Sequence, residues 1–158
     1  MKRHLLLALG AVFLAACGAG GEAAAPAGFP PEIQARIEAE RQECAAVQMG
    51  ALEEVPLDAL RTGDFNADGA PDYVLSHEAF RCAESGSMYC GSAGCSFTVF
   101  VSTPGGGLDA INQGNAQDVV ITRDGDRDVL DLALHGSVVG AETEYARLRW
   151  DGDSFEPQ

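Results

Sequence analysis

One nine-residue stretch constrains the fold more than any other part of the sequence: Asp64-Phe65-Asn66-Ala67-Asp68-Gly69-Ala70-Pro71-Asp72. It carries oxygen-bearing side chains at positions 1, 3, 5 and 9, and a glycine at position 6. Glycine adopts the left-handed conformation of a sharp turn without steric cost. Apolar β-type segments flank the stretch, among them Tyr73-Val74-Leu75. The chain is therefore expected to reverse direction here between two strands.

The same spacing suits a hard cation. Ca²⁺ takes six to eight oxygen ligands, and alternating side chains of a curled loop can supply them. The residues that would do so are the side chains of Asp64, Asn66 and Asp68, the carbonyl of Ala70, and Asp72 directly or through water. The alternative is a turn held by Asp and Asn side chains bonded to the backbone, without any ion. Such a turn needs only one or two of these residues, so the four acceptors favour a structural calcium site.

The loop is not an EF-hand, because position 12 is Leu75 instead of a bidentate Glu and no helix pattern follows. The segment Gly63–Leu75 instead resembles the FG-GAP/VCBS repeat of β-propeller blades, in which a D-x-N-x-D-G-x-x-D loop between two strands binds Ca²⁺. That resemblance implies the same ligands, with Ala70 acting through its carbonyl. Only one good copy is present. The segment Asp124–Asp128 is a degenerate echo containing Arg127, and we expect a plain hairpin turn there.

The N-terminus has the pattern of an export signal. Lys2 and Arg3 precede an apolar run, Leu5 to Ala16, which is shorter than the ~20 residues of a membrane-spanning helix. Leu14-Ala15-Ala16-Cys17 resembles the lipobox of bacterial lipoproteins. This implies cleavage after Ala16 and lipidation of Cys17, which would anchor the chain in a membrane. The alternatives are an ordinary secreted protein with an unpaired cysteine, or an uncleaved anchor.

The chain therefore divides into three predicted parts: a lipoprotein signal peptide at 1–16, a flexible tether at 17–29 and a single domain at 30–158. The tether is rich in Gly, Ala and Pro, which cannot bury a core. We expect the domain to face the periplasm of a bacterial cell envelope. Gly18 after the cysteine favours the outer membrane, by analogy with enterobacterial sorting rules.

The excess of acidic over basic residues restricts the kinds of molecule that the protein can bind. The whole chain has a formal net charge of −14, and removing residues 1–16 would leave eight Arg, no Lys and 24 acids, a net charge of −16. Such a surface repels nucleic acid and anionic headgroups. It is compatible with simple solvation, with cation binding or with a basic partner.

Four cysteines remain after Cys17, namely Cys44, Cys82, Cys90 and Cys95. An even number in an oxidising compartment indicates two disulfides. The favoured pairing is Cys90–Cys95, which closes a short Gly/Ser loop, with Cys44–Cys82. The pairing Cys44–Cys90 with Cys82–Cys95 comes next. A structural zinc site is the rival, but no second close pair of cysteines accompanies Cys90 and Cys95.

The predicted fold class is α+β: an N-terminal helix packed on a small, blade-like antiparallel β-meander stapled by disulfides. The helix is expected from Glu32 to about Met49, with one apolar face carrying Ile33, Ile37, Cys44 and Val47. Short strands then follow at regular spacing. They are expected at 73–75, 96–102, 108–111, 119–122, 128–134 and 144–150, ending at Phe155.

The whole chain also resembles a group of small secreted proteins or lipoproteins, chiefly of alphaproteobacteria. The shared features are the D-N-D-G loop, the element Cys90-Gly91-Ser92-Ala93-Gly94-Cys95, and a terminal hairpin with Trp150-Asp151-Gly152 and Phe155. This resemblance implies no activity. We expect His77 on the surface, and no motif indicates a catalytic residue. The function expected is therefore a non-enzymatic envelope module with a protein partner. The alternative is an envelope hydrolase using Asp64, Asp68 or Asp72.

Overall fold

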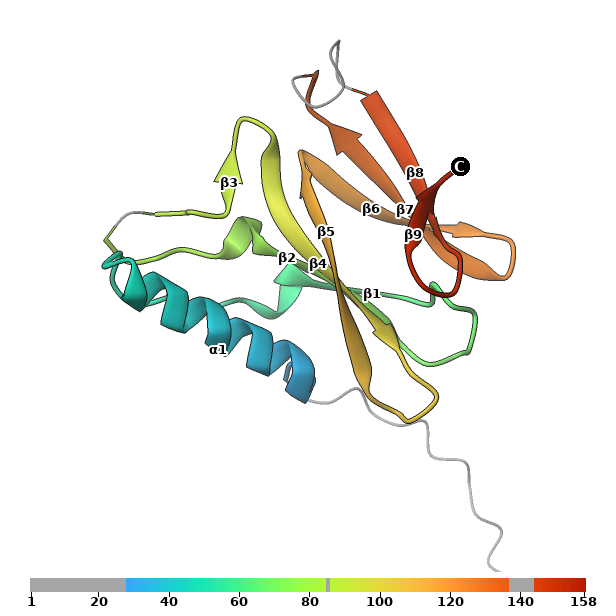
Figure 1. Cartoon of the computed structure of the whole chain (residues 1–158), viewed down its shortest axis with the longest axis horizontal. Helices are drawn as coiled ribbons and strands as arrows, with labels where there is room; N and C mark the ends of the chain where they lie inside the picture. The colour runs from blue at the N-terminus through green and yellow to red at the C-terminus, as the bar shows by residue number, and fades with distance from the viewer. Residues whose placement is uncertain (1–27, 85, 137–143) are drawn as a thin grey trace, which may run out of the picture.

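The computed structural model describes residues 28–84, 86–136 and 144–158. The predicted signal peptide, Cys17 and the tether up to residue 27 lie outside this part of the chain. The described residues form a mixed α+β fold that is mostly β, with one α-helix and two antiparallel sheets (Figure 1). Within the described part, no helix is both long and apolar enough to cross a membrane.

The first sheet has five strands, in the order β1-β2-β4-β3, with β5 paired to β4. Their bounds are β1 Leu60–Gly63, β2 Asp72–Ser76, β3 Cys90–Gly91, β4 Gly94–Ser102 and β5 Leu108–Ala116. The second sheet pairs its strands in chain order, and these are β6 Asp118–Asp124, β7 Arg127–Leu134, β8 Glu144–Trp150 and β9 Phe155–Pro157. Two short 3₁₀ turns, η1 Leu57–Ala59 and η2 His77–Ala79, precede β1 and follow β2. The predicted single meander is thus divided between two sheets, and only the second is a simple meander.

The helix α1 spans Pro31–Ala46 and is the first element of the described residues. A proline in the first turn loses no helical hydrogen bond there. Ile33, Ile37 and Cys44 are buried, as the spacing predicted. The prediction for Val47 was wrong: its side chain is 48% exposed, because the helix ends one residue earlier and Val47 forms the C-cap.

The first sheet is covered on both faces. On β4, Phe97 and Val99 belong to the core between the two sheets, whereas Phe100 belongs to the core under the helix. This alternation is what a strand imposes, because its successive side chains point to opposite faces. In Figure 1 the helix runs along one side of the first sheet and β6–β9 lie on the other.

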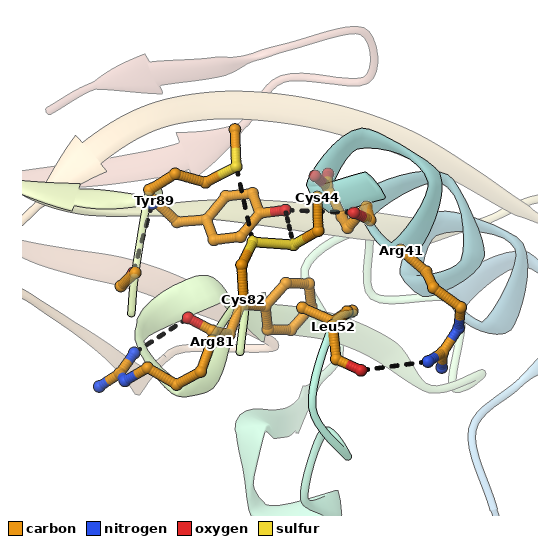
Figure 2. Close-up of a disulfide and its surroundings, with 10 residues drawn as sticks. Arg41, Cys44, Leu52, Arg81, Cys82 and Tyr89 are labelled. Carbon is orange, nitrogen blue, oxygen red and sulfur yellow. Dashed lines mark hydrogen bonds between the residues drawn. A yellow bond between two sulfur atoms is a disulfide. The ribbon is translucent and has the colours of Figure 1, made fainter. Parts of the chain in front are cut away.

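The four cysteines of the described residues form two disulfides, in the pairing that the sequence favours. Cys44 of α1 is bonded to Cys82, with 5.7 Å between the Cα atoms, and this links the helix to the segment after η2. Figure 2 shows the ring of Tyr89 beside this bond, and its hydroxyl lies 3.9 Å from Cys44 Sγ. Cys90 and Cys95 are bonded across β3 and β4, where they are directly opposite.

Candidate functional site

The Asp64–Asp72 loop joins β1 to β2, which pair antiparallel with Gly63 opposite Asp72. The predicted chain reversal between two strands is therefore confirmed. Two loop residues adopt left-handed backbone conformations: Ala67 at φ 59° and Gly69 at φ 80°. A positive φ is uncommon at a residue other than glycine, so other contacts must hold Ala67 in place.

Those contacts come from the side chains at positions 1, 3 and 5 of the loop. The carboxylate of Asp64 accepts from the amides of Asp68 (3.2 Å) and Gly69 (3.3 Å). Asn66 Oδ1 also accepts from the amide of Asp68 (3.0 Å), and Asp68 Oδ1 accepts from the amide of Ala70 (2.7 Å). Three oxygen-bearing side chains therefore converge on three successive amides, which curls the loop.

Asp68 is held as an anion. The pKa of its carboxyl is lowered, chiefly because the amide of Ala70 donates to it. Hydrogen bonds from the side chains of Ser102 and Asn66 lower it further, while partial desolvation acts in the opposite direction. A carboxyl in this state suits cation binding better than proton donation.

Asp72 has a different environment from the other acids of the loop. It is fully buried, and Oδ2 accepts from the amides of Phe65 (2.6 Å) and Asn66 (3.4 Å). Its Oδ1 accepts from the amide of Ser102 (2.7 Å) at the end of β4. Three backbone donors satisfy a buried carboxylate without an ion. Asp72 is thus better suited to anchoring the loop than to ligating a metal directly.

The loop contacts both sheets. The Phe65 ring is fully buried in the core between them, edge-on to Phe155 at 5.3 Å between ring centroids. The amide of Asp64 donates to Asp128 Oδ2, and the amide of Asp128 donates to the carbonyl of Asp64, both at 2.8 Å. Asn66 donates to the carbonyl and hydroxyl oxygens of Ser102, both at 3.0 Å. The loop is therefore a junction between β4 of the first sheet and β7 of the second.

Sequence reasoning missed Asp128 and Ser102 as partners of the loop. Asp128 ends the segment Asp124–Asp128, for which the sequence predicts a plain hairpin turn and no contact with the loop. It forms the predicted hairpin turn between β6 and β7. Its contact with the loop depends on how the two sheets pack, and no local pattern around Asp128 encodes that packing.

The loop residues fit a hard cation in part. Across the described ranges, no group of three or more His, Cys, Asp or Glu side chains is arranged to hold a metal ion. The loop instead offers three oxygen-bearing side chains of two kinds: the carboxylates of Asp64 and Asp68 and the amide of Asn66. These are hard oxygen donors of the type that Ca²⁺ prefers. Ala70 contributes its amide to the Asp68 carboxylate.

The prediction that His77 lies on the surface was wrong. The turn η2 places it in the interior, where it is 2% exposed and stacked on Phe80 at 4.7 Å between centroids. Its Nδ1 lies 2.9 Å from Ser96 Oγ. Burial lowers its pKa to about 4, and the positive charge of Arg36 acts in the same direction. The imidazole is therefore neutral near pH 7, as in a satisfied core histidine.

The structure thus places the predicted loop at the junction of the two sheets and forms both predicted disulfides. Cys17 lies outside the described residues. No protein-family model, no curated protein sequence and no solved structure matches the chain.

Proposed function

We propose that this protein is a non-enzymatic binding module of the bacterial cell envelope, anchored by lipid at Cys17 and stabilised by Ca²⁺ at the Asp64–Asp72 loop. The observation that carries the proposal is the junction made by the loop: its own polar groups bond the end of β4 and the start of β7. An ion at this point would stabilise the contact between two sheets. The lipobox-like sequence before Cys17 supports the location, with the outer membrane favoured.

The ion would relieve a local conflict of charge. Asp64 and Asp68 place two carboxylates within one short loop, where like charges repel. The side chains that would hold Ca²⁺ are those of Asp64, Asn66 and Asp68. The resemblance to FG-GAP/VCBS loops implies these three together with Asp72 and the carbonyl of Ala70. The ion would supply structural stability and no chemical step. With free ion at ten times Kd, binding would stabilise the fold by about 1.4 kcal/mol.

Thermal unfolding of the mature lipoprotein, purified in detergent, tests the calcium site. We expect a higher Tm with Ca²⁺ than with a chelator, and a smaller difference in the variant Asp68→Asn. The matched control is Asp153→Asn, an exposed acid in the β8–β9 turn, which should keep the full difference. An identical Tm with and without Ca²⁺, together with no bound ion by native mass spectrometry, would contradict the site.

The anchor is tested separately. Mass spectrometry of the mature chain should find acyl groups on Cys17, and the variant Cys17→Ala should leave the membrane fraction. Recovery of an unmodified N-terminus, or unchanged membrane association of the variant, would contradict the anchor. A pull-down from envelope membranes with and without Ca²⁺ then tests for a protein partner.

The alternative function, an envelope hydrolase acting through Asp64, Asp68 or Asp72, has less support. Asp72 is buried among backbone donors, and the lowered pKa of Asp68 opposes a general-acid role. A hydrolase screen would favour it only if turnover were detected and Asp68→Ala abolished it without loss of folding.

A further inference from the structure

The strand β5 forms an open edge of the first sheet. It has nine residues, and within the described ranges it pairs with β4 and with no other strand. The neighbours of β4 on its other side are β2 and the short β3. The second edge of β5 is therefore left to be paired.

Two hydrogen bonds show which main-chain groups of β5 point to this open edge. Leu108 lies opposite Ser102 of β4, but the amide of Ser102 donates to Asp72 at the start of β2, on the other side of β4. The amide of Leu108 donates to Glu32 Oε1 of the helix, at 3.3 Å. These two residues are thus a pair without mutual hydrogen bonds, in which both amides point away from the shared ladder.

The main-chain groups of Ala110 point the same way. In an antiparallel pair, residues with and without mutual hydrogen bonds alternate along the strand. The pairing is regular from Leu108 to Ala110, so Ala110 directs its amide and carbonyl to the open edge and Ile111 directs its own to β4. Ala110 is exposed, and no side chain plays for it the part that Glu32 plays for Leu108 in the described residues.

The sequence of β5 does little to block this edge. Proteins usually protect such edges with lysines, prolines, bulges or very short strands. The strand has no Lys, Arg or Pro, and Asp109 is its only charged residue. The register shift opposite Phe97 and Thr98 lies beyond the regular stretch that contains Ala110. An extended segment can therefore pair here as an additional strand, which is an established mode of peptide recognition.

Pockets flank β5 on both faces of the sheet. On the side of the second sheet, a pocket of about 310 Å³ is lined by Asp109 and Ile111 of β5 and by Trp150 and Asp153. On the helix side, a pocket of about 360 Å³ lies between α1 and the far end of the strand, at Asn115. Successive side chains of an added strand point to opposite faces, so they would meet these two pockets in turn.

The exposed charges beside β5 are acidic. Asp109 and Asp153 are exposed in the first pocket, whose lining includes no basic side chain. In the second pocket Glu43 is exposed, and the one basic residue, Arg36, is paired with Glu40. These charges favour a basic segment. A second copy of this chain, with a net charge of −14, would instead bring more acid to the same edge.

We propose that β5 binds an extended, basic segment of a partner protein as an added strand. Ala110 exchanges main-chain hydrogen bonds with the segment, and Arg or Lys side chains of the segment reach Asp109 and Asp153. Trp150 in the same pocket offers aromatic surface to those cations. The inference rests on the partner-binding role proposed for the module and is independent of the calcium loop and of lipidation.

Fluorescence anisotropy with the mature lipoprotein in detergent tests the proposal, using the labelled peptide Thr-Arg-Val-Arg-Val-Arg-Thr as probe. In Ala110→Pro the outward amide is removed, and proline is tolerated at an edge position whose amide does not join the ladder. We expect about tenfold weaker binding, the effect of one main-chain hydrogen bond, with an unchanged Tm. The matched control Ala110→Val keeps the amide and should bind as the parent does.

The charge contribution is measured with a second pair of variants. Asp109→Asn should weaken binding about threefold, because an exposed ion pair contributes little. Asp58→Asn, an exposed acid of η1 that lines neither pocket, should leave binding unchanged. The same peptide with Glu in place of Arg should not bind. Equal binding of the Arg and Glu peptides would overturn the proposal.

Modified peptides keep the proposal falsifiable if Ala110→Pro fails to fold. Two versions of the probe carry N-methyl groups on alternate residues, so each lacks the main-chain donors of one edge. Only one version should lose binding, because only one edge of the peptide faces β5. The proposal is overturned if both versions bind as the parent peptide does, or if sedimentation shows a dimer that Ala110→Pro abolishes, since the edge would then pair with a second copy.

The pull-down from envelope membranes separates this inference from the proposed function. A partner captured by the parent and lost in Ala110→Pro supports the edge. A partner captured equally by both leaves the binding role of the module in place and overturns the edge. Failure to capture any partner would contradict the proposed function, whereas the peptide titration still decides whether β5 accepts a strand.

Discussion

The two sides of the first sheet are held in different ways. On the helix side, a disulfide joins α1 to the chain after η2, and His77, Phe80 and Tyr89 pack as a ring cluster beside it. On the other side, the second sheet is held by apolar packing and by the Asp64–Asp72 loop, whose Asp64 exchanges hydrogen bonds with the amide and carboxylate of Asp128. The stability of the helix side should therefore depend on whether the disulfide is oxidised or reduced. The stability of the loop side should depend on the charge of its carboxylates and on bound ions.

Removing the disulfide of the helix side should have the largest effect. The bond between Cys44 and Cys82 spans 38 residues of sequence, and the chain-entropy model assigns such a loop about 4 kcal/mol. The double variant Cys44→Ala/Cys82→Ala should lose about that much free energy of unfolding in urea. The matched control, Cys90→Ala/Cys95→Ala, removes a bond spanning 5 residues and should lose about 2 kcal/mol. Equal losses would show that the length of the closed loop does not set the stability.

Acid should destabilise the helix side through the buried His77. The pKa of His77 is about 4 in the folded protein, against about 6.5 for an unperturbed histidine. Below pH 6.5 the unfolded chain binds the proton and the folded protein does not, so stability falls as the pH falls towards 4 and then levels off. The loss should reach about 3 kcal/mol.

Urea unfolding from pH 7 to pH 4 measures this loss. In the variant His77→Phe the dependence between pH 6.5 and 4 should disappear, because the titrating group is gone. Asp68 does not mask the effect: its pKa is lowered from an ordinary value of 3.8, so its contribution changes at more acidic pH. An unchanged pH dependence in the variant would refute the assignment.

On the loop side, the buried carboxylate of Asp72 should contribute to stability whether or not Ca²⁺ is present. In Asp72→Asn, one of the oxygens that accept from three backbone amides becomes an NH₂ group, which faces a donor with a donor. Leaving a buried group without a partner costs about 2 kcal/mol, and that loss should be present with or without Ca²⁺. Asp68→Asn is the control, because it is exposed and should lose little stability in the absence of the ion. A Ca²⁺-dependent loss in Asp72→Asn would instead identify Asp72 as a ligand.

Local patterns predicted the elements well and their packing poorly. A strand is predicted at 96–102, and β4 forms there. Phe97 and Val99 lie on one face of it and Phe100 on the other, which is the period of two that a strand imposes. The division into two sheets depends on pairings between distant segments, which such a pattern does not contain. The prediction for His77 failed for the same reason: it packs against Tyr89 and lies beside Ser96, which are 12 and 19 residues further along the chain.

The loop shows the same limit at a smaller scale. The spacing of Asp64, Asn66 and Asp68 predicted a curled turn, and these side chains do bond successive amides. Asp72 belonged to the same pattern, yet its carboxylate is occupied by the backbone of Phe65 and Ser102. Ser102 lies 30 residues further along the chain, and only the folded sheet brings the two together.

The smallest loss of unfolding free energy should come from the variant Gly69→Ala. Comparison with Gly94→Ala distinguishes the cost of backbone strain from the cost of steric crowding. Gly69 has φ 80°, and a Cβ built there would meet no atom within 4 Å. Gly69→Ala should therefore cost only the left-handed strain, about 1 kcal/mol, without disturbing a neighbour. Gly94→Ala is the contrasting variant, because its Cβ would lie 2.0 Å from the carbonyl oxygen of Ala116 and should cost much more. If Gly69→Ala lowers the free energy of unfolding as much as Gly94→Ala does, the loop is more rigidly fixed between the sheets than its open surroundings imply.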